Sequence, residues 1–401
     1  MSARSETPAR VEFYRHQLGA EEKASWATVL ETLFLTLGPQ VASFERELGE
    51  YLVAGSDRAP LHVVGTNSCS MGLLVAHKAF DIGPGDEVIT TPMTFAASLN
   101  AALHLGAKIV LVDVEPTTGL LDPAKVRAAI TPKTKAIVPV HLYGQLADMR
   151  ALRAIADEHQ LVIIEDSAHG IEMERDGVRA GQLGDAAVFS FYATKNLTSG
   201  DGGAIATRHA HIADRCRRLR NHGASKSASD RHGGGFKHWD LVELGYKANL
   251  TDLDAALLRP QLPRADEKRG RREQLAHRYE SEFRKRLASH FWTASKNGVP
   301  FLVESRGKSA HHLFTIQPPA RLRDPLLTRL GEAGIGVAVN YLAAHTLSYL
   351  VEVLKKPRGS FPIAEEIGDR TISLPMYPTL TEAEQDRVVD VVATSLIELS
   401  K

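Results

Sequence analysis

The 401-residue chain contains only two cysteines, Cys69 and Cys216, and their spacing matches neither a metal-ligand set nor a disulfide framework. We therefore expect reduced thiols in the cytoplasm and no metal site. Long apolar runs are also missing, since none approaches the roughly 20 residues that a membrane helix needs, and the stretch MSARSETPARVEF has no signal-peptide region. We expect no membrane association.

Neither sign of charge is in excess, because 48 Lys and Arg residues balance 48 Asp and Glu residues. A balanced chain has no overall electrostatic attraction to nucleic acid or to an anionic membrane. We therefore expect small-molecule partners and, for an anionic ligand, a local binding site. At 43% hydrophobic content, the chain can bury enough apolar surface for one large and one smaller domain.

From residue 61 onward, short β-rich runs alternate with helical stretches. The predicted strands are HVVGT, EVITTP, KIVLVDV, KAIVPVHLYG, LVIIEDS, AAVFSFY and GGAIAT, and helices are predicted at 71–80 and 95–105, from Pro123 and from Asp148. This alternation predicts an α/β fold with a mostly parallel central sheet flanked by helices. Ligands of such sheets bind beyond the carboxyl ends of the strands, so we expect the site among Ser70, Phe95, His141, Asp166, His169, Ser190 and Lys195.

The second half of the chain begins with a polar, glycine-rich segment, 223–238, which predicts a long surface loop. Helical periodicity resumes over 245–262 and continues in a long charged helix at about 264–287. A smaller α+β region is expected to follow, with HHLFTIQPP, a helix from Asp324, GIGVAVNYL and a terminal helix from Thr381. We therefore predict a large domain over 1–262 and a small C-terminal α+β domain over 263–401.

Two charged residues have the positions that an aldehyde cofactor needs. Lys195 follows an apolar strand and precedes a glycine-rich turn in FSFYATKNLTSGDGG, where a partly desolvated amine can form an imine. Asp166 ends LVIIEDS, where a carboxylate can keep the pyridine nitrogen of pyridoxal 5′-phosphate (PLP) protonated. Taken alone, Lys195 is better explained as a solvated surface lysine. Asp166 alone is also compatible with a helix cap or a metal ligand.

The segment NSCSMGLL, 67–74, places small residues at the start of a helix, where free backbone amides and the helix dipole favour a phosphate. Ser70 and Met71 are the candidates there, and the hydroxyl of Ser190 is a candidate from a neighbouring strand. The competing interpretation is a serine-capped helix that binds nothing.

Two ring-bearing residues complete the pattern. Phe95 can lie flat on a cofactor ring, although a core phenylalanine is equally consistent with TPMTFAAS. His169 can hydrogen-bond a ring hydroxyl or assist proton transfer, although most of the 17 histidines are expected to be structural. A lysine, an acid, a helix start, a serine and an aromatic all follow strands at one predicted edge, and this convergence favours a PLP site.

These motifs resemble those of the DegT/StrS family of PLP-dependent nucleotide-sugar aminotransferases. The markers are GPGDEVITTPMTF, GAKIVLVDVEP, ITPKTKAIVPVHLYG, VIIEDSAHG, FSFYATKNLTSGDGG and LGYKANLTDLDAAL, in family order over nearly the whole chain. The resemblance implies the aspartate-aminotransferase-like fold, PLP fold type I. It also implies the site residues: Lys195 as the Schiff-base lysine, Asp166 at the pyridinium, His169 at the ring hydroxyl, Phe95 as the stacking ring, Ser190 on the phosphate and Ser68-Cys69-Ser70 as the phosphate cup.

The resemblance further implies a homodimer with shared active sites, in which the GYKAN segment reaches the cofactor of the neighbouring subunit. Lys247 and Asn249 both remain candidates for this contact. Three positions depart from the family pattern, because Ser70 replaces a threonine, Asp201 a glutamate and Ala248 an aromatic residue. None of the three removes a group that the chemistry needs.

The implied reaction transfers the amino group of L-glutamate to a nucleotide-linked keto sugar, with pyridoxamine phosphate as the intermediate form of the cofactor. The product would be an amino sugar for a surface polysaccharide or a secondary metabolite. His169, GYK-x-N-L-T-D and AAHTLSYL resemble the branch that makes UDP-4-amino-4-deoxy-L-arabinose, so a UDP-4-keto sugar is the expected acceptor. Candidate substrate contacts are Gly38, Tyr143 and His345.

Four alternatives are open at this point. A 3-keto sugar, or a sugar linked to dTDP or GDP, is compatible with the same motifs. PLP-dependent sugar dehydration is disfavoured because the relatives that perform it replace the lysine with histidine, and a non-catalytic PLP-binding paralogue is disfavoured by the intact Lys195, Asp166 and phosphate cup. A metal- or nucleotide-binding protein without PLP is disfavoured because the glycines at 233–235 do not follow a strand.

Overall fold

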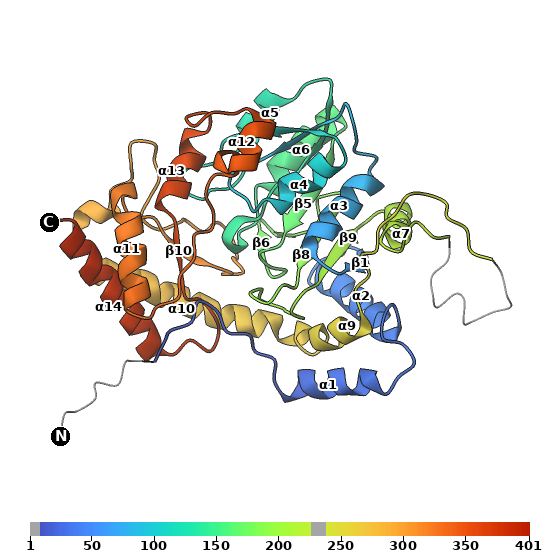
Figure 1. Cartoon of the computed structure of the whole chain (residues 1–401), viewed down its shortest axis with the longest axis horizontal. Coiled ribbons are helices and arrows are strands. Elements are labelled where there is room, and N and C mark those ends of the chain that lie inside the picture. Colours follow the sequence, from blue (N-terminus) through green and yellow to red (C-terminus); the bar gives the residue numbers. More distant parts are fainter. Residues whose placement is uncertain (1–8, 226–237) are drawn as a thin grey trace.

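The computed structural model describes residues 9–225 and 238–401. At its centre lies a seven-stranded sheet (Figure 1), in the order β1 (His62–Thr66), β9 (Gly203–Thr207), β8 (Ala186–Ser190), β5 (Val162–Ser167), β4 (Thr134–Ile137), β2 (Glu87–Thr90) and β3 (Lys108–Leu111). Strands β8, β5, β4, β2 and β3 run parallel to one another, whereas β9 is antiparallel to both β1 and β8. The predicted α/β fold with a mostly parallel sheet is confirmed.

Helices cover both faces of this sheet. Val88 and Ile164 pack in the core under α3 (Cys69–Ala79), α4 (Ala97–His104) and α7 (Ala210–Leu219). Their chain neighbours Ile89 and Ile163 pack in the opposite core, under α2 (Pro39–Tyr51), α5 (Pro123–Ala129), α6 (Met149–His159) and α9 (Asp252–Leu258). Because both faces are buried, most residues of the sheet are apolar, and strands such as β8 (AAVFS) appear in the sequence as continuous apolar runs.

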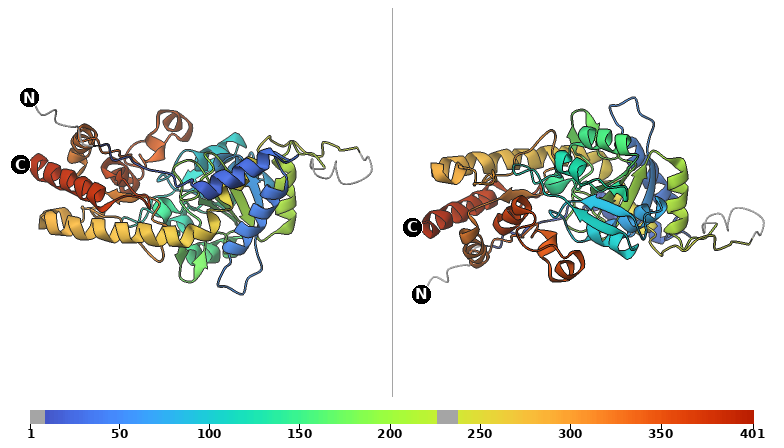
Figure 2. Two further views of the ribbon diagram at one scale, coloured as in Figure 1. Left: turned by 90° about the horizontal axis from the view of Figure 1, so that it is seen from below. Right: turned by 90° about the horizontal axis from the view of Figure 1, so that it is seen from above.

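The chain then continues through α10 (Ala265–Arg286), the predicted charged helix. An antiparallel pair, β10 (Phe314–Ile316) with β11 (Ile372–Leu374), and the helices α11 (Ala320–Glu332), α12 (Ser348–Leu354), α13 (Pro362–Arg370) and α14 (Glu382–Leu399) form the C-terminal part. Helices α10 and α14 lie side by side (Figure 2) over a third core, in which the rings of Tyr279 and Phe314 stack 4.8 Å apart. The exact domain boundary at 262/263 stays a prediction.

The described chain also contains α1 (Ala20–Leu30), which packs on α9, the short hairpin of β6 (Glu174–Arg175) and β7 (Val178–Arg179), and the 3-10 helices η1 (Leu142–Gly144), η2 (Leu262–Arg264), η3 (Ser289–Trp292) and η4 (Ala344–Thr346). The predicted surface loop at 223–238 lies mostly outside the described residues. Within the described ranges, no helix is both long enough and apolar enough to cross a membrane.

The predicted helix over 245–262 is shorter than expected. Only α9 is helical, and the side chain of Thr251 caps its first turn. The residues before it are extended, because Asn249 pairs with Thr66 and the amide of Asn67 donates to the carbonyl of Ala248. Contacts with β1 therefore override the helical periodicity of this segment.

The helix predicted from Asp324 begins earlier, at Ala320, and includes Pro325. Its buried side chains are Leu322, Leu326 and Leu330, which lie on one face at a spacing of one helical turn. Burial of Leu322 extends the helix to the N-terminal side of the proline. The terminal helix predicted from Thr381 is present, with the Thr381 side chain as its N-cap.

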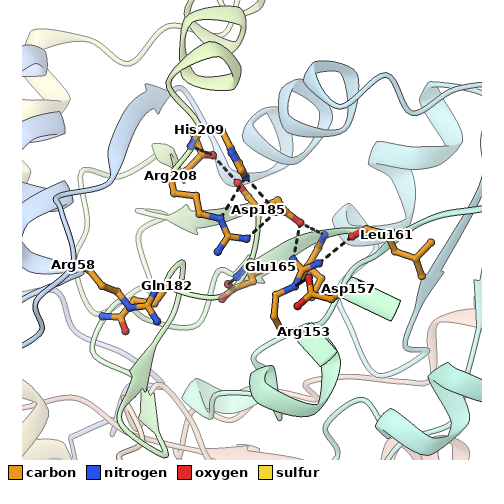
Figure 3. Close-up of polar contacts among 12 residues, drawn as sticks. Arg58, Arg153, Asp157, Leu161, Glu165, Gln182, Asp185, Arg208 and His209 are labelled. Carbon is orange, nitrogen blue, oxygen red and sulfur yellow. Dashed lines mark hydrogen bonds and ion pairs between the residues drawn. The ribbon is translucent and has the colours of Figure 1, made fainter. Parts of the chain in front are cut away.

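A cluster of charged residues fixes the sheet at the edge where β5 begins. Asp185 directly precedes β8, and its carboxylate accepts hydrogen bonds from Arg153 on α6 at 3.0 Å, from Arg208 at 2.9 Å and from the Ile163 amide at 2.8 Å (Figure 3). Burial opposes ionisation of Asp185, but these donors outweigh it and lower the pKa of the carboxyl group. The network ties α6, β5 and β8 together.

We expect Asp185→Asn to lower the free energy of unfolding by about 1–3 kcal/mol at pH 7, because it leaves buried donors poorly satisfied. Because the pKa of Asp185 is lower in the folded state, its ionised carboxylate stabilises the protein above the unfolded-state pKa of about 4. This stabilisation is lost as the pH falls through the folded-state pKa. The difference between wild type and variant in urea unfolding should therefore narrow below about pH 4.

Asp157→Asn is the matched control, because Asp157 pairs with the same Arg153 but its side chain is 69% exposed. Such a surface pair contributes less than about 1 kcal/mol. Equal unfolding midpoints for the two variants at pH 7 would contradict a structural role for the Asp185 network.

Candidate active site

A cavity of about 450 Å³ opens beyond the carboxyl ends of β5 and β8, within the size range of small-molecule sites. The amino end of β9 reaches the same edge because this strand is antiparallel. Segments from outside the sheet close the cavity at Phe13 and at Asn340-Tyr341. The sequence-predicted residues that line it are Ser68, Cys69, Ser70, Phe95, Asp166, His169, Ser190 and Lys195.

Lys195 lies in the turn between β8 and β9, where its amide donates to the carbonyl of Tyr192 at 2.8 Å. Its amine is surrounded by protein, and burial lowers the pKa of Lys195 to about 8, although the nearby Asp166 and Cys69 partly oppose this shift. A larger fraction of the amine is therefore unprotonated at neutral pH than in an exposed lysine. Such an amine is suited both to imine formation and to proton transfer.

Asp166 lies near the end of β5 and is almost fully buried. One carboxylate oxygen accepts a hydrogen bond from the Ser98 hydroxyl at 2.5 Å, and the other accepts from the Ala168 amide at 3.1 Å. The hydroxyls of Ser98 and Thr94 are 2.6 Å apart. The carboxylate is therefore held in one orientation and keeps lone pairs for a ligand.

The start of α3 forms the opposite end of the cavity. The Ser68 side chain caps the helix by accepting from the Met71 amide at 3.2 Å, so the predicted Met71 donor is used within the protein and Met71 does not line the cavity. Within the described ranges, the amides of Cys69 and Ser70 have no protein acceptor. These free donors at a helix N-terminus suit a phosphate.

Glycine is required where β9 passes this helix start. A Cβ atom on Gly203 would lie 2.5 Å from the backbone carbon of Ser68, and Gly202 has φ +150°, a conformation that residues with a side chain rarely adopt. The glycine-rich turn after Lys195 therefore brings the start of β9 into close contact with the backbone at the start of α3. Asp201, which replaces the family glutamate, lines the cavity beside this turn.

The hydrogen bonds of His169 fix its tautomer. Its Nδ1 accepts from the Tyr143 amide at 2.9 Å, so in the neutral ring the proton is on Nε2, which is 3.0 Å from the Tyr341 hydroxyl. Burial lowers the pKa of His169 well below its usual value, and Lys195 and His141 lower it further. His169 is therefore a neutral donor at the cavity wall.

Phe95 is 61% exposed at the cavity, and its ring lies 6.0 Å from that of Tyr341 at 48°. A large aromatic side chain that stays exposed beside a cavity provides a face for a planar ligand. This placement is compatible with the predicted stacking role.

Seven predicted residues do not line this cavity: Met71, discussed above, and Gly38, His141, Tyr143, Lys247, Asn249 and His345. His141 is fully buried, with its Nε2 2.8 Å from the Glu165 carboxylate. Gly38 precedes α2, where its amide donates to Asp252 at 2.7 Å, and a Cβ on Gly38 would lie 2.5 Å from that carboxylate. Tyr143 contacts the site through its amide, which donates to His169 Nδ1, whereas its side chain is buried and does not line this cavity. Lys247 and Asn249 lie on the far side of β1, outside the cavity lining.

The predicted substrate contact of His345 is not supported by its position. The side chain has no exposed surface, and its Nε2 lies 3.0 Å from the Glu365 carboxylate. Burial and this pairing explain the residue structurally, because a buried polar ring needs a hydrogen-bond partner.

Sequence reasoning missed Phe13, Ser98, His312, Asn340 and Tyr341. Ser98 had a signal, since it follows Thr94 by one helical turn next to a predicted cofactor residue. The other four come from segments far from the sheet in sequence, and no local pattern marks them. His312 is the partner of the Lys195 amine, with 3.3 Å between His312 Nε2 and Lys195 Nζ.

The model of the DegT/DnrJ/EryC1/StrS aminotransferase family matches residues 16–393. The chain belongs to this family. It is 38% identical over 385 residues to the spore coat polysaccharide biosynthesis protein SpsC of Bacillus subtilis (strain 168), covering 94% of each chain. Among solved structures it is similar to DesV of S. venezuelae, with 35% identity, a TM-score of 0.83 and coverage of 96% of this chain and 98% of that one.

A further solved relative is NtdA of Bacillus subtilis with bound cofactor PMP, at 28% identity, a TM-score of 0.80 and coverage of 96% of this chain and 87% of that one. Like these family members, the protein is a PLP-dependent sugar aminotransferase, and the predicted aspartate-aminotransferase-like fold is confirmed. The residues present fit the cofactor. A lysine amine, an oriented carboxylate and free helix amides face one cavity.

We expect Ser98→Ala to weaken PLP binding by about tenfold or more, because a hydrogen bond to a charged group contributes about 1.5–3 kcal/mol. Without it the Asp166 carboxylate loses its fixed orientation. The dissociation constant can be measured by absorbance titration of the apoenzyme. Asn100→Ala, an exposed position on the same helix, is the control, and equal affinities of the two variants would contradict the orienting role of Ser98.

Proposed function

We propose that this protein transfers the amino group of L-glutamate to a nucleotide-linked keto sugar, with a UDP-4-keto sugar as the acceptor. The observation that carries the proposal is the Lys195 amine, which faces the same cavity as the Asp166 carboxylate and the free amides of α3. Membership of a sugar aminotransferase family supports the sugar as acceptor, and similarity to SpsC, a spore coat polysaccharide biosynthesis protein, supports a product for a surface polysaccharide.

Bound PLP would supply a ring that stabilises negative charge on the carbon next to the amino group. Asp166 would hold the proton of the ring nitrogen, His169 would donate from Nε2 to the ring hydroxyl, and the amides of Cys69 and Ser70 with the Ser190 hydroxyl would bind the phosphate. Phe95 would cover one face of the ring. Each of these groups lines the cavity or opens onto it from α3.

Lys195 would carry the proton in both halves of a ping-pong reaction. A pKa of about 8 allows its amine to accept a proton from a carbon acid and to release it again near neutral pH. The buried position keeps competing water away from this exchange. Lys195→Ala is therefore expected to abolish turnover.

The identity of the sugar is proposed from the motifs around His169 and 245–252. The cavity wall adds groups that suit sugar hydroxyls, namely Thr194, Asp201 and Asn340, and the side-chain oxygen of Asn340 has no hydrogen-bond partner. A 3-keto sugar or a dTDP- or GDP-linked sugar is the alternative acceptor.

The acceptor can be tested with UDP-, GDP- and dTDP-linked 3- and 4-keto sugars, scored by amine formation with glutamate. We expect the UDP-linked 4-keto sugar to react fastest and Lys195→Ala to react with none. Reaction only with another sugar would replace the UDP-4-keto assignment. A cofactor absorbance spectrum that does not respond to glutamate would contradict the proposed donor.

We also propose a homodimer with shared active sites. Large apolar side chains are exposed on two segments, with Leu33 and Leu244 each 80% exposed, and contact with a second copy would bury them. Lys247 is exposed. Asn249 is buried, and with its amide suitably oriented it donates to the Arg220 carbonyl at 3.0 Å and accepts from Lys247 at 2.8 Å. We therefore assign the contact with the partner's cofactor to Lys247.

Mixed dimers test this assignment. Subunits with Lys195→Ala and subunits with Lys247→Ala are each expected to be inactive or weakly active alone. Co-refolding the two should restore activity, because a mixed dimer then has one site with an intact Lys195 from one subunit and an intact Lys247 from the other. If mass spectrometry detects mixed dimers but activity is not restored, Lys247 lies in the active site of its own subunit or outside both active sites. Asn249→Ala is the comparison and should mainly lower thermal stability.

A further inference from the structure

We propose that His312 is a positioning residue for the reaction, whose Nε2 accepts a hydrogen bond from the Lys195 amine and thereby aims the amine's lone pair at the substrate carbon. The two nitrogens are 3.3 Å apart. His312 is buried, and it comes from a segment beyond α10 that is remote in sequence from the rest of the site. The proposal deepens the amino transfer proposed above and rests on it.

The other polar groups near the amine are already engaged. The Asp166 carboxylate accepts from Ser98 and Ala168, and both ring nitrogens of His169 are within hydrogen-bond distance of other partners. Cys69 is buried with its thiol 3.8 Å from the Val188 carbonyl. Among the described residues, His312 Nε2 is thus the hydrogen-bond partner of Lys195 Nζ.

His312 is suited to accept a hydrogen bond from the Lys195 amine but not to remove the proton from it. Burial lowers the pKa of His312 well below its usual value, and the positive charges of Lys195 and Arg272 and the neighbouring His169 lower it further. At neutral pH the imidazole is therefore uncharged. With a pKa of about 8, the Lys195 amine is mostly protonated at neutral pH and can then only donate. Facing this donor, the uncharged ring offers the lone pair of Nε2 and carries its proton on Nδ1.

The segment that carries His312 is held in place from two sides. The Ala310 amide donates to the Gly144 carbonyl at 2.8 Å, and the Ala310 carbonyl accepts from Arg272 Nε at 2.9 Å and from Asn196 at 3.2 Å. Gly144 has φ +93°, and a Cβ there would lie 3.0 Å from the His312 amide. Any side chain at position 144 would therefore displace the segment.

The same network holds the lysine. Asn196 directly follows Lys195, and its side chain lies between the Ala310 carbonyl and the Glu172 carboxylate, at 3.2 Å and 3.4 Å. Glu172 and Arg272 form a buried ion pair at 2.7 Å. Burying such a pair costs desolvation energy and is weak evidence for stability. Here it fixes both ends of the Lys195–His312 contact.

The consequence for proton transfer follows from geometry. A neutral amine has two N–H bonds and one lone pair. When one N–H bond is directed to His312 Nε2, rotation about the last bond of the lysine side chain is restricted, and the lone pair can face the cavity. In the reaction the C–H bond of the donor breaks and an N–H bond forms on Nζ, and the same proton later returns to carbon, so His312 gains and loses nothing overall.

Two variants separate the hydrogen bond from the shape of the side chain. His312→Gln keeps an amide group at nearly the position of Nε2, whereas His312→Phe keeps a planar ring without an acceptor. His311→Gln is the neighbouring control, because His311 lines a different cavity. If His312→Phe does not fold, His312→Asn replaces it, since its shorter side chain does not reach Nζ.

The first measurement uses the full-length apoenzyme and does not depend on activity. The pH dependence of Lys195 labelling by an amine-selective acylating reagent, followed by peptide mass spectrometry, gives the pKa of this amine. An acceptor stabilises the protonated amine, so His312→Phe should shift the labelling midpoint down by about one pH unit, and His312→Gln and His311→Gln should stay near wild type.

The second measurement is the single-turnover rate of the holoenzyme with L-glutamate. His312→Phe should slow this step about tenfold to a hundredfold with little change in the glutamate concentration at half-maximal rate, because misplacement of a catalytic group has that order of effect. Deuterium at Cα of glutamate should then slow the variant more than wild type. His312→Gln should recover most of the rate.

An unshifted labelling midpoint in His312→Phe, or a rate equal to wild type, would overturn the role of His312. Failure of the proposed function is distinguishable from this result. In that case wild type itself would show no response to glutamate, while the labelling midpoints would still differ between the His312 variants.

Discussion

Burial of the Lys195 amine is the constraint on which the rest of the site depends. An amine enclosed by protein is less easily protonated, and the pKa of about 8 places Lys195 where it can react and exchange protons at neutral pH. The sheet provides this enclosure, because β8 delivers the lysine and β5 delivers Asp166 at the same edge. Removing the carboxylate from this edge would take away a nearby negative charge that partly opposes the effect of burial on the pKa of Lys195.

The enclosure is completed by parts of the chain that belong to no strand of the sheet. Phe13, His312 and Tyr341 come from the N-terminal segment and from the C-terminal half, and each closes one side of the space around the lysine. Long α10 links these segments to the sheet, and its buried Arg272 contacts both Glu172 and the Ala310 carbonyl. The chemistry therefore depends on docking of the C-terminal part as much as on the sheet.

The sheet and the residues at its edge could be predicted from sequence because the signals are local. Strand runs end at Asp166 and Ser190, and parallel pairing brings such ends together by topology alone. Residues such as His312 and Tyr341 follow no comparable rule, since their approach depends on how a distant segment packs. The predicted helix over 245–262 was wrong over its first residues for the same reason, because pairing of Asn249 with Thr66 outweighed local periodicity.

The predicted substrate residues show a further limit of motif reading. The structure gives each of these three residues a structural role. Gly38 approaches Asp252 closely, the Tyr143 amide fixes the His169 tautomer, and His345 forms a buried pair with Glu365. A family motif indicates that a residue is required. It does not show whether the residue contacts the substrate or only supports the structure around the site. Tyr143 shows the difference most clearly, because its backbone sets the proton of His169 while its side chain is buried away from the cavity. Determinants of the sugar are therefore better sought among the polar groups that line the cavity, such as Asn340, than among the residues that carry the motif.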